Sequence, residues 1–584
     1  FHPKRGRRSD LAYPELTLLV SPSPPLRHEG AVGVEVFHGI LQVGIDVRLG
    51  DGVYMISVII SGNVIISSIS ADYRQKPVII SGNRLFLAIP ADYNRFFSYF
   101  CSRGAIKDSH RIMLIGRKYE LSLLHEAFES DQSEFLAVTG RRRVGKTYLV
   151  EEAFHDHFTF RHAGLAKGDM TDQLLAWQSS LKDCGLTQAP RSRSWMEAFD
   201  ALKDLIRSSG DSKKIIFIDE LPWIDTPRSK FVMALEHFWN GWASARRDIL
   251  LIVCGSATSW IVNKVYRNHG GLYGRVTRRI NIFPFTLAEC QEYAQSRGLV
   301  LTPMQILSAY MVMGGIPYYW SMMVKGLSVD QNLDLLFFSR EAPLKNEFDS
   351  LYASLFKNPE PYISVVTALG KKRMGMSRLE LVGAAEGLSD NGQLSTVLTD
   401  LEYCGFIRRN TMIGKTNNAI FQLVDNYTLF YFKFIEGNRY NDENYWTNNI
   451  NTPRHNTWAG LAFEMVCFAH VPQIKTALGI AGVSANVCSW QTRGTNDQPG
   501  AQIDMIIDRA DGIINVCEMK YSSSEYAISG DYDLRLRNKV AALQQDGQQR
   551  KAIHLTMITT LGLQRNAYAG DIQSQVTLMD LMRK

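Results

Sequence analysis

Four residues in the first half of the chain have types and spacing that point to phosphate chemistry: Gly140, Gly145, Lys146 and Thr147. They belong to the stretch Gly-Arg-Arg-Arg-Val-Gly-Lys-Thr at residues 140–147, which is typical of phosphate-binding loops. The glycines let the backbone curl so that consecutive N–H groups point at one anion. Lys146 is expected to reach the β- and γ-phosphates of a nucleotide, and the Thr147 hydroxyl to hold Mg²⁺. The candidate nucleotide ligands are all eight loop residues: Gly140, Arg141, Arg142, Arg143, Val144, Gly145, Lys146 and Thr147.

Two acidic residues follow an apolar run further along the chain. Residues 213–218 read as a buried strand, and Asp219 and Glu220 end it. In phosphoryl-transfer sites one acid holds Mg²⁺ and another group orients the attacking water. We assign the metal, through a water molecule, to Asp219 and the attacking water to Glu220. Ser256 follows a third apolar run and fits two interpretations, a sensor of the γ-phosphate or a turn-forming residue.

The elements needed to position these residues are also visible. An apolar run at 135–139 precedes the loop and a helix-forming stretch at 148–154 follows it, which is the strand–loop–helix context that the loop requires. We therefore predict an α/β fold whose core is the parallel sheet of a P-loop NTPase.

A second chemical site is predicted in the C-terminal part. Glu464 lies in an apolar helix-like run, Asp504 lies in a strand-like run, and residues 513–520 end in Glu518-Met-Lys520. Alternation places Glu518 and Lys520 on one face of their strand, and the turn at 509–512 brings the Asp504 strand alongside. Carboxylates at Glu464, Asp504 and Glu518 suit a Mg²⁺ shell for phosphodiester cleavage, with Lys520 stabilising charge or positioning water. The alternative is a solvated charge pair at a strand end.

Several motifs together resemble the archaeal-type AAA ATPases, which are relatives of the AAA+ and STAND NTPases. Besides the loop they are LIGR at 114–117, IIFIDE at 215–220, CGSATSW at 254–260, LYGRV at 272–276 and GGIPYY at 314–319. The resemblance covers about residues 113–584. It implies that Gly116 and Arg117 lie near the adenine and that Arg275 is a γ-phosphate sensor or arginine finger. Arg275 is equally well explained as a surface arginine.

The same resemblance extends to the nucleotide and to the C-terminal part. Residues 263–266 read Asn-Lys-Val-Tyr and so lack the final Asp of the guanine-reading motif, which favours ATP over GTP. The C-terminal order of one helix and three strands resembles the PD-(D/E)xK nuclease superfamily. It also resembles the domain that accompanies this class of ATPase.

The chain is expected to contain five parts. Residues 58–63 recur at 78–83, and residues 71–73 recur at 91–93, so the N-terminal part holds a two-copy repeat of strand-and-turn character. We expect the functional chain to begin at Met113, which directly precedes the LIGR motif. The predicted parts are an atypical segment at 1–112, a P-loop ATPase core at 113–285, a helical lid at 286–359, a winged helix at 360–425 and a PD-(D/E)xK nuclease-like domain at 426–584.

Composition leaves the partners open. A formal charge of +6 over 584 residues neither demands nor excludes nucleic acid. Eight cysteines without a C-x₂-C pair predict neither a zinc site nor a disulfide framework, and this fits the cytoplasm. No apolar run reaches the roughly 18 residues of a membrane span, so no membrane association is expected.

Two functions follow from these observations. The first is an ATP-binding and ATP-hydrolysing switch, requiring ATP and Mg²⁺, which is coupled to a winged helix and to a nuclease-like domain acting on DNA. The alternative is an ATP-dependent regulator that binds DNA or protein and whose nuclease-like domain is not catalytic. In both, an arginine from a neighbouring subunit could complete the ATPase site, which would require a homo-oligomer.

Overall fold

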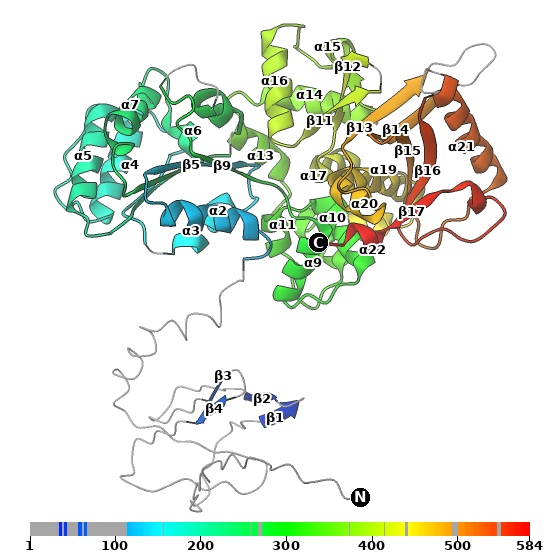
Figure 1. Cartoon of the computed structure of the whole chain (residues 1–584), viewed down its shortest axis with the longest axis horizontal. Helices are drawn as coiled ribbons and strands as arrows, with labels where there is room; N and C mark the ends of the chain where they lie inside the picture. The colour runs from blue at the N-terminus through cyan, green and yellow to red at the C-terminus, as the bar shows by residue number, and fades with distance from the viewer. Residues whose placement is uncertain are drawn as a thin grey trace, which may run out of the picture. The chain divides into compact units, whose positions relative to one another are not determined.

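The computed structural model divides the chain into two compact units, Phe1–Ile112 and Met113–Lys584 (Figure 1). It describes four short strands in the first unit, and residues 114–584 apart from 156, 257, 267–270, 373, 414, 439–441, 493–499 and 546–549. Within these residues no helix combines the length and the apolar character needed to cross a bilayer.

The described part of the first unit consists of two antiparallel pairs of strands. Of the first copy of the repeat, residues 58–60 lie in β3 and residue 63 begins β4, while residues 61–62 lie outside the described residues. The second copy, with residues 71–73 and 91–93, lies outside the described residues. The strands are β1 (Val34–Phe37), β2 (Ile40–Val43), β3 (Ser57–Ile60) and β4 (Asn63–Ile66).

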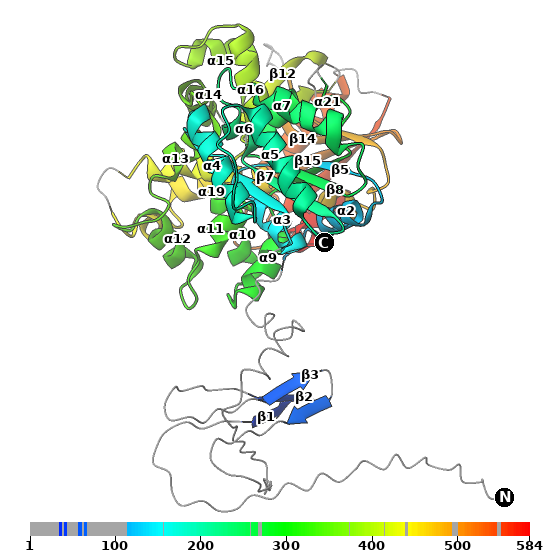
Figure 2. The ribbon, with the colours of Figure 1, turned by 90° about the vertical axis from the view of Figure 1, so that its left-hand side faces the viewer.

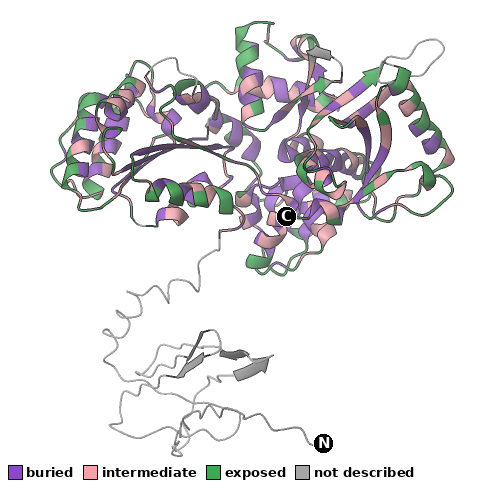
Figure 3. Ribbon diagram, in the orientation of Figure 1, coloured by how far each residue is buried: buried purple, intermediate pink, exposed green. Residues whose placement is uncertain are grey.

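A five-stranded sheet, parallel throughout, follows in the second unit. Its spatial order is β6-β7-β8-β5-β9, so β8 lies between β5 and β7. Both β5 and β8 are buried along their whole length, as expected for parallel strands covered on both faces (Figure 3). The predicted α/β core with a parallel sheet is confirmed. The strands are β5 (Glu134–Gly140), β6 (Phe160–Ala163), β7 (Lys214–Asp219), β8 (Ile249–Cys254) and β9 (Arg278–Ile282).

Helices cover both faces of this sheet because its side chains alternate between two cores. Leu136 and Val138 of β5 share a core with the helices α2 and α3. Phe135 and Ala137 share the other core with α4, α5 and α7 (Figure 1). The helices of this part are α2 (Lys118–Glu129), α3 (Lys146–Phe154), α4 (Met170–Asp183), α5 (Trp195–Ser208), α6 (Leu221–Ile224), α7 (Phe231–Phe238), η2 (Trp239–Ala243), α8 (Thr258–Ile261) and η3 (Val262–Tyr266).

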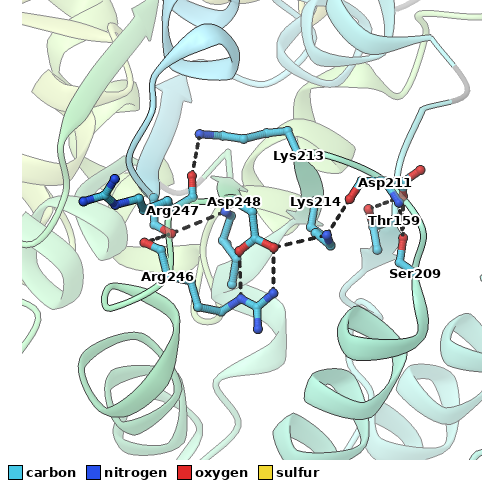
Figure 4. Close-up of polar contacts among 10 residues, drawn as sticks. Thr159, Ser209, Asp211, Lys213, Lys214, Arg246, Arg247 and Asp248 are labelled. Carbon is cyan, nitrogen blue, oxygen red and sulfur yellow. Dashed lines mark hydrogen bonds and ion pairs between the residues drawn. The ribbon is translucent and has the colours of Figure 1, made fainter.

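A charged cluster closes the end of the sheet at which β7 and β8 begin (Figure 4). Asp248 accepts two hydrogen bonds from the Arg246 guanidinium, at 2.8 and 2.6 Å, and lies 3.1 Å from the Lys214 ammonium. The hydrogen bonds from Arg246 lower the pKa of Asp248 to about 2. Because the strands are parallel, this cluster marks the end of the sheet opposite to the loop that follows β5.

A helical segment follows the parallel sheet, in the region predicted as a lid. Capping boxes begin three of its helices, with Thr286, Thr302 and Ser328 as the N-cap residues. The helices are α9 (Leu287–Ser296), α10 (Pro303–Met313), α11 (Pro317–Ser321), α12 (Val329–Phe337) and α13 (Glu347–Leu355).

Three helices and three short strands come next, and Figures 1 and 2 show the helices as neighbours. β12 pairs antiparallel with both β10 and β11. The elements in chain order are α14 (Glu360–Lys371), β10 (Met376–Ser377), α15 (Arg378–Ala384), α16 (Gly392–Tyr403), β11 (Ile407–Met412) and β12 (Lys415–Leu423).

The C-terminal strands continue the same sheet instead of forming a separate one. The spatial order is β10-β12-β11-β13-β14-β15-β16-β17, and β11 joins β13 in parallel through the pair Met412 and Ser489. The remaining elements are α17 (Asn426–Phe430), η4 (Tyr431–Ile435), α18 (Tyr445–Asn449), α19 (Pro453–Ala469), α20 (Val471–Ala477), β13 (Ala485–Thr492), β14 (Ala501–Arg509), β15 (Ile513–Lys520), α21 (Gly530–Leu543), β16 (Ala552–Thr559), η6 (Ala569–Asp571), β17 (Ser574–Thr577) and α22 (Leu578–Leu581).

Two helices cover opposite faces of the C-terminal strands. Cys517 and Met519 of β15 share a core with α19. Ile514 and Val516, on the other face, pack with α21 through Leu536. The odd-numbered residues of β15 therefore face α19, and the even-numbered residues face α21.

Candidate nucleotide site

The loop at 140–147 has the backbone shape that phosphate binding requires. It connects β5 to α3, which begins at Lys146. Gly140 has φ 141°, and a Cβ there would lie 2.3 Å from the Ile282 carbonyl oxygen. Gly145 has φ 90° with open space beside it. A side chain at either position would strain the loop.

Lys146 is a buried cation without an anionic partner in the described part of the chain. Its side chain is 6% exposed, and the ammonium donates to the Arg141 carbonyl oxygen at 2.8 Å and to Ser256 Oγ at 3.2 Å. None of the described carboxylates lies within ion-pair distance of it. A buried charge without a counter-charge is costly, so the site is built to receive an anion.

The Mg²⁺ ligands expected from the sequence lie side by side. The Thr147 hydroxyl donates to Asp219 Oδ2 at 2.6 Å, and the backbone N–H of Glu220 donates to Asp219 Oδ1 at 2.8 Å. Over the described residues, no group of three or more His, Cys, Asp or Glu side chains is placed to hold a metal. Mg²⁺ bound with a nucleotide takes one or two protein oxygens together with phosphate and water oxygens, so this pair fits it.

Glu220 and Ser256 meet beside Lys146, because β8 lies between β5 and β7. Ser256 Oγ donates to Glu220 Oε1 at 2.9 Å, and the Ser256 backbone N–H lies 3.3 Å from Oε2. Glu220 itself has φ 47°, in the left-handed region that non-glycine residues seldom adopt. The Glu220 carboxylate is thus joined to Lys146 through the Ser256 hydroxyl. The sensor role of Ser256 stays a prediction.

The side chains of two loop arginines are held by buried carboxylates far along the chain. Arg141 forms an ion pair with Asp425, the N-cap residue of α17. Arg143 forms an ion pair with Glu347 in α13, and its guanidinium carbon lies 4.2 Å from the centre of the Tyr318 ring. Sequence reasoning missed both carboxylates, and no local signal connects them to the loop. Arg142 makes no ion pair with any described residue.

The residues expected near the adenine lie against the start of α9. Arg117 has φ 58°, donates to the Phe283 carbonyl oxygen at 2.5 Å and stacks on Phe285. Burial lowers its pKa. A Cβ on Gly116 would lie 2.1 Å from Glu289 Oε1. Both residues thus connect α2 to α9, and their contact with adenine stays a prediction.

Arg275 differs from the other arginines of its cluster. Arg278 pairs with Glu126 at 2.9 Å, and Arg279 stacks over Tyr266 at 4.3 Å from the ring centre. Arg275 is exposed and forms no ion pair with a described residue. Its two interpretations therefore both remain open.

At the C-terminal site, the Glu518 carboxylate already has a cation and a hydroxyl as partners. Its carboxylate accepts hydrogen bonds from Lys539 at 2.5 Å and from the Tyr532 hydroxyl at 2.8 Å. The Lys520 ammonium lies 4.9 Å from the centre of the Tyr532 ring, so Glu518 and Lys520 share the face toward α21. Burial, with Glu518 beside it, raises the pKa of Tyr532.

The other two predicted metal ligands are placed differently. Ser489 of β13 faces a bulge in β14, because Cys488 pairs with Ile506 and Trp490 with Ile503. Asp504 lies in this bulge, accepts from Gln502 at 2.5 Å and lines a hollow with residues of β11, β12 and β13.

Glu464 is buried in α19, which covers the opposite face of the sheet from α21. The structure does not bring Glu464, Asp504 and Glu518 together as one metal shell, since no such group of three exists among the described residues. The prediction relied on the turn at 509–512 to bring Asp504 alongside Glu518, but the ladder between β14 and β15 ends at Met505, next to the bulge.

Comparison with known proteins identifies the segment around the loop. Residues 132–291 match the AAA domain family AAA_14. The resemblance to AAA ATPases is therefore confirmed for this segment, which begins just before β5 and ends within α9. The AAA domain contains the loop, Asp219, Glu220 and Ser256.

Longer similarities exist as well. An uncharacterized protein of Methanocaldococcus jannaschii is 26% identical over 326 residues, which is 55% of this chain and 69% of that protein. The Walker-type ATPase of Pyrococcus abyssi is 18% identical, with TM-score 0.40, over 55% of this chain and 96% of that one. The ORC2 protein of Aeropyrum pernix is 11% identical, with TM-score 0.35, over 62% and 98%.

Proposed function

We propose that the AAA domain binds ATP with Mg²⁺ and hydrolyses it, and that this reaction switches the C-terminal half of the chain. The observation that supports this most strongly is the buried Lys146 ammonium without a carboxylate partner, beside the paired Thr147 and Asp219. Bound Mg²⁺ would supply charge neutralisation for the phosphates. Glu220 would orient and activate the attacking water, and Ser256 would hold the carboxylate of Glu220 in place.

The elements from α14 to β12 support a winged helix, and we propose that this part is the first to respond to the nucleotide bound by the AAA domain. Their order is helix, strand, two helices and two strands, and the strands form one antiparallel group. α16 occupies the position that would enter a DNA groove, yet Gly392–Tyr403 contains no Lys or Arg. α16 packs instead against α8, which starts two residues after Ser256. We therefore favour a protein-packing role for this part.

The C-terminal part supports a nuclease-like scaffold without catalysis. From α19 onward the chain has a second helix, α20, and then the strands β13, β14 and β15, which includes the order of a helix and three strands on which the resemblance rests. The carboxylate that would bind metal, Glu518, is already paired with Lys539. We propose that the chain is an ATP-dependent regulator that acts through its C-terminal half on another protein or on DNA.

The nucleotide proposal is tested by two substitutions in the full chain. Lys146→Ala removes the buried cation, and we expect it to abolish binding of a fluorescent ATP analogue in Mg²⁺. Glu220→Gln retains the shape of the site, so it should leave binding intact and reduce kcat by about 10²–10⁴. Lys214→Ala, at the other end of the sheet, is the matched control. Binding that survives Lys146→Ala would contradict the proposal.

A further inference from the structure

The two ion pairs of the loop arginines connect the nucleotide site to the C-terminal half. Asp425 and Glu347 are both buried, and so is Arg141. The Asp425 carboxylate raises the pKa of Arg141 although burial alone would lower it. Each pair joins the loop to an element more than 200 residues further along the chain. Removing one partner of such a pair leaves an uncompensated buried charge.

These ion pairs also affect the position of the loop residues that are expected to bind phosphate. The Arg141 carbonyl oxygen accepts a hydrogen bond from the Lys146 ammonium at 2.8 Å, so the anchoring of Arg141 affects where Lys146 lies. Arg143 has φ 69°, a strained conformation that its contacts with Glu347 and Tyr318 hold in place. The Tyr319 hydroxyl in turn donates to Glu347 at 2.6 Å. The GGIPYY motif thus helps to shape the loop.

Asp425 is also the N-cap residue of α17. One carboxylate oxygen, Oδ1, pairs with Arg141, while Oδ2 accepts from the Thr428 backbone N–H at 2.9 Å and from the Thr428 hydroxyl at 2.5 Å. One carboxylate thereby caps a helix and anchors the phosphate loop. A change in either partner is transmitted to the other, and such a coupling must act in both directions.

We propose that Asp425 and Glu347 are positioning residues of the nucleotide site, and that they make ATP affinity depend on the packing of α17 and α13. They hold Arg141 and Arg143 so that the loop backbone and Lys146 keep the shape that receives the phosphates. This proposal rests on ATP being the ligand of the loop. It assigns the regulation of that site to two residues outside the AAA domain segment.

The direct test measures binding of a fluorescent ATP analogue in Mg²⁺ to the full chain carrying Asp425→Asn. Asn still caps α17, so the helix is retained while the charge is lost. We expect Kd to rise about tenfold or more, since tenfold corresponds to about 1.4 kcal/mol. Asp425→Glu should restore most of the affinity. Asp248→Asn removes a more exposed ion pair at the other end of the sheet, away from the loop, and should leave Kd unchanged (Figure 4).

Two further measurements separate positioning from general damage. Arg141→Gln combined with Asp425→Asn should weaken binding no more than either substitution alone, because the pair acts as one unit. ATP should also change hydrogen exchange at Thr428 in the wild type and not in Arg141→Gln. Additive losses, or exchange at Thr428 that ATP leaves unchanged, would overturn the proposal.

The outcomes distinguish this proposal from the proposed function. A wild-type chain that binds no ATP contradicts the proposed function itself. ATP binding that depends on Lys146 but is unaffected by Asp425→Asn contradicts only the positioning role.

Discussion

At the scale of single residues, the two candidate sites differ in how a buried charge is compensated. Lys146 has hydroxyl and carbonyl partners only in the described part of the chain, whereas Glu518 has Lys539 and the Tyr532 hydroxyl. A buried cation without a counter-ion favours binding of an anion. A carboxylate that already has a cation has less to gain from a metal. The first site is therefore suited to bind nucleotide, and the second is suited to remain a scaffold.

The residue-scale prediction concerns cleavage at the second site. We expect the wild-type chain to leave single- and double-stranded DNA intact in Mg²⁺ or Mn²⁺, with and without ATP, because Lys539 occupies the Glu518 carboxylate. Gel electrophoresis of labelled DNA measures this. Cleavage that disappears with Lys520→Ala would show that the site is catalytic after all. Cleavage that survives Lys520→Ala would point to a contaminant.

At the scale of elements, a buried histidine joins α9 to the C-terminal half. His470 Nε2 accepts a hydrogen bond from the Leu287 backbone N–H at 2.9 Å, and Nδ1 donates to the Val466 carbonyl oxygen at 2.8 Å. Since an N–H only donates and a carbonyl only accepts, this pattern requires the neutral ring. Burial lowers the pKa of His470 to about 4. The hydrogen bond from the Leu287 N–H to His470 thus exists only while His470 is unprotonated.

This geometry predicts an acid-sensitive contact. The pKa in the folded state lies below the unfolded value of about 6.5, so the contribution of His470 is complete above pH 6.5 and is lost as pH falls toward 4. At pH 5 the loss is about 2 kcal/mol. Calorimetric unfolding between pH 7 and 5 measures it. His470→Gln should flatten the pH dependence, while the exposed control His237→Gln should not. An unchanged slope in His470→Gln would refute the assignment.

Some of these elements could be predicted from the sequence and others could not. β5, β7 and β8 each contain an unbroken apolar run, and the loop residues that bind phosphate are adjacent in the sequence, so local sequence is sufficient to predict them. The helices α9 and α10 begin after the capping residues Thr286 and Thr302, which can be read from the sequence. The bulge at Asp504 depends on how β13 pairs with β14, which local sequence does not specify.

Ion pairs and strand pairs between residues far apart in the chain could not be predicted for the same reason. Asp425 reads as the N-cap of a helix, and that part of its role is local. Its ion pair with Arg141 spans 284 positions and requires the fold of the entire second unit. The predicted boundary at residue 425 likewise gave no sign that β11 and β13 would join into one sheet.

At the scale of the whole molecule, every residue assigned to the nucleotide site belongs to the unit Met113–Lys584. We therefore expect deletion of residues 1–112 to leave the Kd for the ATP analogue unchanged. Titration of the shortened and full chains under the same conditions measures this. A large loss of affinity, with the shortened chain still folded by calorimetry, would show that the first unit contributes to the site.

The junction between β11 and β13 has a consequence for how such chains can change over evolutionary time. One residue pair, Met412 and Ser489, connects the group β10–β12 to the strands that follow, whereas the other neighbours in the sheet share longer ladders. Recombination that replaced everything from β13 onward would divide the sheet between β11 and β13, where the two strands share the fewest residue pairs. The anchors Glu347 and Asp425 precede that point, so a new terminal module would inherit the connection to the phosphate loop unaltered.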